Sequence, residues 1–206
     1  MVSRKTLLRR GLWVEYASLA WMFVESLVAI SGGLIAGSLA LLAFGGDSFI
    51  ELISSYAVAV HIRNLLRNPE ATRREVGSEQ IERFATLLLI SLIPMIALGG
   101  IYSYVSRIEP QSSLAGIAIA GGAIVIMPVL WFEKRRIGKQ ADCRPLSIDA
   151  IESATCFLMS VALLGGLLVN YFIHVPWIDY VATSIILAFV AKEAAESFRE
   201  FRKEDA

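Results

Sequence analysis

Long apolar segments constrain this chain more than any other feature of its sequence. Six stretches of mostly apolar residues follow one another along the 206 residues. They cover residues 12–30, 37–60, 84–104, 114–132, 146–172 and 178–195. A helix needs about 20 such residues to cross the hydrocarbon core of a bilayer. The sequence therefore predicts an all-α membrane protein with six transmembrane helices. Residues 1–206 are expected to form one domain, with no separate soluble domain.

Composition excludes several classes of protein. The chain is 56% hydrophobic and only 18% charged, whereas soluble domains usually carry about a quarter charged residues. Its 19 basic residues balance its 19 acidic residues, so there is no net positive field to attract nucleic acid. Two cysteines, Cys143 and Cys156, do not make a disulfide framework. We also find no phosphate-binding glycine loop and no nucleophile triad, and an enzyme is not expected.

Basic residues alternate between the two ends of the predicted spans. The N-terminus, the connections after the second and fourth spans, and the C-terminal end hold all of the 19 Lys and Arg residues except Arg107. Lys and Arg are enriched on the cytoplasmic side of membrane proteins. We therefore expect both termini in the cytoplasm and a multi-pass membrane protein.

Acidic side chains inside the predicted spans give the strongest indication of function. They are Glu25 in the first span, Asp47 and Glu51 in the second, and Asp149 and Glu152 in the fifth. An ionisable group in the hydrocarbon costs at least ~2.5 kcal/mol and usually marks a pathway or a site. No Lys, Arg or His falls in the middle of a predicted span. We therefore expect these acids to be protonated, hydrated or bound to a cation, rather than paired with an internal base.

Spacing places four of these side chains at a common depth. Asp47 and Glu51 are four residues apart, as are Glu152 and Cys156, so each pair shares one helix face. At ~1.5 Å per residue, Asp47 lies ~15 Å below the outer edge of the membrane and Cys156 ~16 Å above the inner edge. In a core of about 30 Å the pairs meet near the midplane. We predict that Asp47 faces Cys156 and that Glu51 faces Glu152.

Three carboxylates and a thiol suit a divalent metal ion. A thiolate among oxygen ligands favours zinc or cadmium over magnesium or calcium. The fully ionised set carries four negative charges, and a divalent ion balances only two of them. Some of the groups are therefore expected to be protonated without metal, so that metal binding releases protons. The sequence predicts exchange of a metal, zinc by preference, for protons.

Other roles stay open for several of these residues. Cys156 alone would be an ordinary buried residue, and Asp149 would also stabilise a helix N-terminus. Glu25 and Asp149 are candidates for supporting the metal ligands or relaying protons. Asp179 is expected to be a helix cap.

Two motifs resemble the membrane domain of the cation diffusion facilitator superfamily. GSLALLAFGGDSFIELISS (Gly37–Ser55) resembles its second-span motif, and SIDAIESATCFLMSVALLGGLLVN (Ser147–Asn170) resembles its fifth-span motif. Trp177-Ile178-Asp179 resembles the usual beginning of its sixth span. Ala191-Lys192-Glu193 is similar to a divergent branch, which includes small prokaryotic members and animal vesicular zinc-binding membrane proteins.

This resemblance implies a homodimer in the lipid bilayer of a prokaryotic plasma membrane that exports divalent metal in exchange for protons by alternating access. By position, it implies that Asp47, Glu51, Glu152 and Cys156 are the metal ligands. The fifth span of the family commonly offers His and then Asp, where this chain has Glu152 and Cys156. The alternative is a zinc-binding or regulatory membrane protein that does not transport. A carrier coupled to protons or sodium for another solute, and a structural subunit, are further alternatives.

Overall fold

The computed structural model describes residues 3–67, 78–106, 109–111 and 113–204. Within these ranges the chain forms six helices and no strands. The helices are α1 (Arg4–Ala36), α2 (Leu39–Arg67), α3 (Ser78–Val105), α4 (Leu114–Ala141), α5 (Arg144–Ile173) and α6 (Ile178–Glu204). The all-α prediction and the six predicted segments are confirmed.

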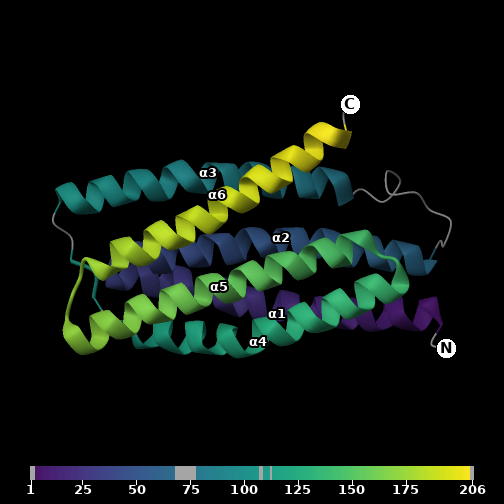
Figure 1. Ribbon diagram of the computed structural model, residues 1–206, viewed down its shortest axis with the longest axis horizontal. Coiled ribbons are helices and arrows are strands. Elements are labelled where there is room, and N and C mark those ends of the chain that lie inside the picture. Colours follow the sequence, from purple (N-terminus) through teal and green to yellow (C-terminus); the bar gives the residue numbers. More distant parts are fainter. Residues whose placement is uncertain (1–2, 68–77, 107–108, 112, 205–206) are drawn as a thin grey trace.

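The helices form one elongated bundle in which successive helices run in opposite directions (Figure 1). Both ends of the chain lie at the same end of the bundle, where α4 also connects to α5. Six predicted spans, an even number, place both termini on the same side of the membrane. The basic residues of the N-terminus and of the α4–α5 connection lie at that end, so we call it the cytoplasmic end.

Five of the helices, α1 to α5, are long and apolar enough to cross a membrane. Helix α6 is more polar because Asp179, Lys192 and Glu193 lie along it. It nevertheless packs against α2, α3 and α5 as a member of the bundle. Asp179 is buried and Glu193 is half-buried, so two of these three charged residues contact the protein interior and α6 need not present them to lipid.

Several helices are longer than the apolar segments that predicted them, chiefly at the cytoplasmic end. The fourth predicted span ends at Phe132, whereas α4 continues to Ala141. Its buried residues continue as well, since Leu130, Lys134 and Ile137 lie on one face. Hydropathy marks where a whole segment is apolar, but a helix persists as long as one face of it is buried.

Helix α2 is central, because it packs against α1, α3, α5 and α6. Its approach to α1 depends on Gly45. A Cβ atom at that position would lie 2.8 Å from the backbone nitrogen of Ile30. Small residues allow helices to approach closely in lipid, and this close packing fixes the turn of α2 that carries Asp47.

The N-terminal end of α2 is capped from α6. Asp179 accepts hydrogen bonds from Ser38 Oγ at 2.5 Å, Leu39 N at 2.9 Å and Ala40 N at 3.3 Å. These amides belong to the unpaired donors of a helix N-terminus, which favours a negative charge. The structure therefore assigns Asp179 the predicted capping role, but on α2 rather than on its own helix.

Candidate metal site

Two helices bring three carboxylates together in the bundle. Asp47 and Glu51 come from successive turns of α2, and Glu193 comes from α6. One carboxylate oxygen from each residue lies within 4.8 Å of the other two. Oxygens bound to one Mg²⁺ or Ca²⁺ ion at about 2.0 to 2.6 Å lie at most about 4 to 5 Å apart. The three side chains thus fit a single divalent ion with little movement. We call these three residues the carboxylate cluster.

The carboxylate cluster is buried without internal compensation. Asp47 is 0% exposed and Glu51 is 4% exposed. Among the described residues, neither carboxylate has a hydrogen-bond partner on either oxygen. Ionised carboxylates in a low-dielectric interior are very costly unless they are paired. This cluster therefore favours a cation, or protons in its place.

Glu193 is not among the ligands predicted from the sequence, although it belongs to the Ala191-Lys192-Glu193 motif. The spacing of residues along α6 nevertheless indicates that Glu193 faces the protein interior. The buried residues of α6 recur as Ala182, Ile186, Val190 and Ala194, and Glu193 lies three residues after Val190 on the same face. An acid on the buried face of a helix in a membrane protein is itself a candidate functional residue.

Cys156 lies beside Glu25 rather than within the carboxylate cluster. Its Sγ atom donates a hydrogen bond to Glu25 Oε1 at 3.6 Å, and both residues are 0% exposed. The thiol is also close enough to Asp47 and Glu51 to interact with them electrostatically. Cys156 and Glu25 therefore flank the carboxylate cluster from α5 and α1, and the ligand role of Cys156 stays a prediction.

Glu152 is the remaining predicted ligand. Its Oε1 atom accepts a hydrogen bond from Ser54 Oγ at 3.4 Å. It interacts electrostatically with Asp47 and Asp149, and Glu51 interacts with it in turn. Helices α2 and α5 are in contact, so the two predicted ligand pairs lie near each other. The group of oxygens that converge within 4.8 Å does not include Glu152.

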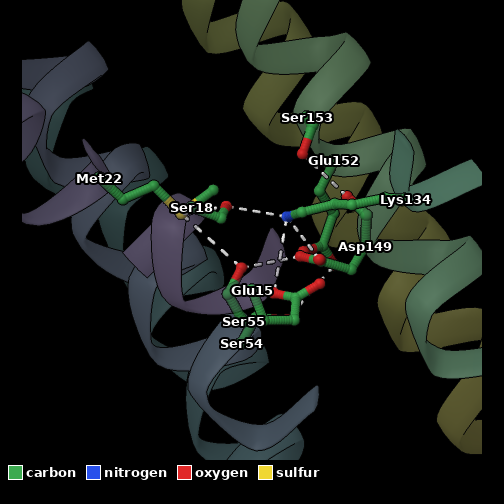
Figure 2. Close-up of polar contacts among 9 residues, drawn as sticks. All are labelled: Glu15, Ser18, Met22, Ser54, Ser55, Lys134, Asp149, Glu152 and Ser153. Carbon is green, nitrogen blue, oxygen red and sulfur yellow. Dashed lines mark hydrogen bonds and ion pairs between the residues drawn. The ribbon is translucent and has the colours of Figure 1, made fainter. Parts of the chain in front are cut away.

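Asp149 is paired with an internal base, contrary to the expectation that no base neutralises the intramembrane acids. Lys134 Nζ on α4 lies 2.6 Å from Asp149 Oδ2, and both side chains are buried (Figure 2). Asp149 Oδ1 also accepts a hydrogen bond from Ser55 Oγ at 2.8 Å. The same ammonium lies 3.7 Å from Glu15 Oε2 on α1. We call Glu15, Lys134 and Asp149 the lysine cluster.

The expectation failed because Lys134 follows the end of the predicted fourth span and was assigned to a cytoplasmic connection with Arg135 and Arg136. Those two arginines are exposed, while Lys134 is 0% exposed. Its position four residues after Leu130 continues the buried face of α4. Glu15 is on the buried face of α1, between Gly11 and Ser18, and that periodicity was the available signal.

Comparison with known proteins identifies the family of the chain. The family described as the cation efflux transmembrane domain matches residues 16–204. The manganese efflux system protein MneS of Bacillus subtilis (strain 168) is 25% identical over 198 residues, which cover 94% of this chain and 67% of MneS. The chain is thus a multi-pass membrane protein similar to a bacterial efflux protein, as expected for a prokaryotic plasma membrane. The family match covers most of the chain, and the chain therefore belongs to the cation efflux family.

Proposed function

We propose that this protein exports a divalent metal cation in exchange for protons, and that Asp47, Glu51 and Glu193 carry the ion. Family membership supports cation export. The metal site and the exchange for protons are supported by the carboxylate cluster. Two of its buried acids have four oxygens without a hydrogen-bond partner among the described residues. Such a cluster, open in turn to either side of the membrane, provides the binding step of alternating access.

Protons are the natural counter-substrate of this cluster. Three ionised carboxylates carry three negative charges, and a divalent ion balances two of them. Without the metal, the full charge in a low-dielectric site is too costly to persist, and protons neutralise it. Metal and protons therefore compete for the same oxygens, so that binding one releases the other. Glu25, which lies beside the cluster, is proposed to pass protons to it.

Manganese is the proposed cargo. The cluster offers oxygen atoms only, and carboxylates suit magnesium, calcium and manganese, whereas thiolates favour zinc. The thiol of Cys156 is hydrogen-bonded to Glu25. The similar Bacillus subtilis protein is named as a manganese efflux protein. The zinc prediction rested on Cys156 as a ligand, and the Cys156→Ser variant tests it. Under this proposal the variant retains manganese affinity, whereas a zinc carrier would lose zinc affinity.

The test is Mn²⁺ uptake into proteoliposomes with an acidic interior. We expect the pH gradient to accelerate uptake by the wild type, and we expect Asp47→Asn to abolish that uptake. Asp142→Asn is the matched control. Asp142 is the left-handed cap residue after α4, with a φ of 49°, and Asn tolerates that conformation. Equal uptake by the wild type and Asp47→Asn would overturn the proposed site.

A zinc-binding membrane protein that does not transport is the second candidate function. It is favoured by the buried pair of Cys156 and Glu25, which offers a sulfur ligand and an oxygen ligand 3.6 Å apart. It predicts stoichiometric zinc binding, lost in Cys156→Ser, without any metal flux under a pH gradient. Gradient-driven uptake by the wild type would exclude it.

A homodimer is part of the proposal, on the strength of the family resemblance. Light scattering of the purified protein, corrected for bound detergent, is expected to give twice the chain mass of 22.6 kDa. The mass of one chain under the conditions that support transport would contradict it.

A further inference from the structure

The lysine cluster takes no part in the metal-binding step proposed above, yet together with Ser55 it joins four helices. Glu15 comes from α1, Ser55 from α2, Lys134 from α4 and Asp149 from α5 (Figure 2). Glu15 and Lys134 are 0% exposed and Asp149 is 1% exposed. Lys134 Nζ also donates a hydrogen bond to Ser18 Oγ at 2.9 Å. A buried ionic group of this kind in a membrane protein marks a functional site by default.

The charges of the lysine cluster do not balance if every group is ionised. Two carboxylates face one ammonium, which leaves one negative charge buried. Asp149 is the satisfied carboxylate, because Lys134 lies 2.6 Å from it and Ser55 donates a hydrogen bond to it. Glu15 lies 3.7 Å from the ammonium, which is too long for a hydrogen bond. With both carboxylates ionised, neither oxygen of Glu15 has a donor among the described residues, whereas a protonated Glu15 can donate a hydrogen bond to Asp149. A proton on Glu15 balances the cluster.

The lysine cluster lies between the carboxylate cluster and the cytoplasmic end. Ser55 follows Glu51 by one turn of α2 in the direction of Arg67. Lys134 lies about two turns from the end of α4 at the α4–α5 connection. Glu152 links the clusters, because it interacts electrostatically with Asp47 on one side and with Asp149 and Lys134 on the other. The acids thus form a series from the metal site toward the cytoplasm.

We propose that Glu15 is a proton-binding residue, separate from the metal site, through which the protons that drive metal export reach the cytoplasm. This inference rests on the proposed antiport. The proton leaves the Glu15 carboxyl for cytoplasmic water. Two carboxylates, Glu15 and Asp149, then share the one ammonium of Lys134, and the excess negative charge draws the next proton from the carboxylate cluster. The charged groups that interact with Glu15 are Lys134 from α4 and Asp149 and Glu152 from α5. On α2, the uncharged Ser55 donates its hydrogen bond to Asp149.

A purely structural role for the lysine cluster makes a different prediction. An ion pair that only holds helices together would change stability when mutated, and it would slow metal transport equally with and without a pH gradient. A proton-binding role changes the response to the gradient itself. The ratio of metal flux with the gradient to metal flux without it therefore separates the two roles.

The experiment measures that ratio for Mn²⁺ uptake into proteoliposomes by the wild type, Glu15→Gln and Glu133→Gln. Gln keeps the shape of Glu15 and cannot release a proton. We expect Glu15→Gln to bind Mn²⁺ with wild-type affinity and to lose the acceleration by the gradient. Glu133→Gln, a half-buried neighbour of Lys134 on α4, is expected to keep it. Wild-type acceleration in Glu15→Gln overturns the inference, whereas absence of flux in the wild type overturns the antiport.

A second measurement does not depend on transport. A protonated carboxyl gives an infrared carbonyl band that is distinct from that of a carboxylate. Difference spectra over a pH titration of the membrane-embedded protein are expected to show a band that is lost in Glu15→Gln and retained in Glu133→Gln. Identical spectra for the wild type and Glu15→Gln would show that Glu15 does not exchange a proton, whatever the metal flux.

Discussion

The carboxylate cluster and the lysine cluster both contain buried acids. They lie near each other, because Ser55, which donates to Asp149, follows Glu51 by one turn of α2. In the lysine cluster, the protein supplies its own cation, Lys134, at 2.6 Å from Asp149. In the carboxylate cluster, Asp47 and Glu51 have no hydrogen-bond partner within the described part of the chain. The lysine cluster therefore contains its own cation, whereas the carboxylate cluster is proposed to take one from solution. Buried acids alone do not distinguish a candidate ion-binding site from an internal ion pair, whereas the presence or absence of an internal cation does.

The largest expected effect comes from removing the fixed cation. Lys134→Met leaves Asp149 buried without its counter-charge, and breaking a buried ion pair in this way costs about 3–5 kcal/mol. The free energy of unfolding in detergent, from denaturant titration, measures the loss. The double variant Lys134→Met/Asp149→Asn is expected to recover most of it, because no uncompensated charge remains at Asp149. A single variant as stable as the wild type would mean that the pair is not formed.

The same test on the carboxylate cluster is expected to give the opposite result. Asp47→Asn and Glu51→Gln each remove a buried acid that has no internal partner, so stability without metal stays the same or rises. Loss of a residue that merely supports a metal ligand costs about 10–100-fold in affinity, and loss of a ligand should cost at least that much. Calorimetric titration with Mn²⁺ measures it. Destabilisation as large as that of Lys134→Met would mean that the two clusters do not differ.

Glu193 tests whether α6 belongs to the metal site. Glu193→Gln is expected to weaken Mn²⁺ binding by about tenfold or more, within the range for altered metal sites. Glu196→Gln is the control on the same helix, since Glu196 is exposed and lies 3.8 Å from Lys192. Equal affinities of the two variants would restrict the metal site to α2 and α5.

The smallest expected effect concerns the support of the lysine cluster. Ser55→Ala removes the hydrogen bond to Asp149 and should lower the free energy of unfolding by about 1 kcal/mol or somewhat more, because the acceptor is charged. Ser160 is equally buried, but it donates to the carbonyl of Cys156 in its own helix. Ser160→Ala should therefore cost less. The reverse order would show that Asp149 does not depend on Ser55.

Much of the fold was predictable from the sequence, because lipid demands long apolar helices. Helices α1 to α5 meet that demand, and the more polar α6 completes the bundle by packing against α2, α3 and α5. The ends of the helices were less predictable. Helix α4 extends beyond Phe132 to Ala141, since a helix that leaves the apolar layer needs only one buried face to continue. Lys134 lies in that extension, which is why an internal base was missed.

The candidate site was predictable where its residues lie one turn apart on one helix. Asp47 and Glu51 meet because their spacing fixes them on one face of α2. Glu193 comes from a helix whose approach to α2 depends on tertiary packing, and no spacing rule gives that contact. The same limit applies to Cys156. Its depth was estimated from α5, but its hydrogen bond to Glu25 depends on how α1 packs against the bundle.

Locating bound manganese tests the central claim most directly. Crystals of the protein grown with Mn²⁺ and measured near the manganese absorption edge would show the ion as a peak of anomalous density. We predict a peak between Asp47, Glu51 and Glu193, and none between Glu15 and Asp149, where Lys134 holds the cation position. A peak at the lysine cluster, or one held by Glu152 and Cys156 without Glu193, would contradict the account.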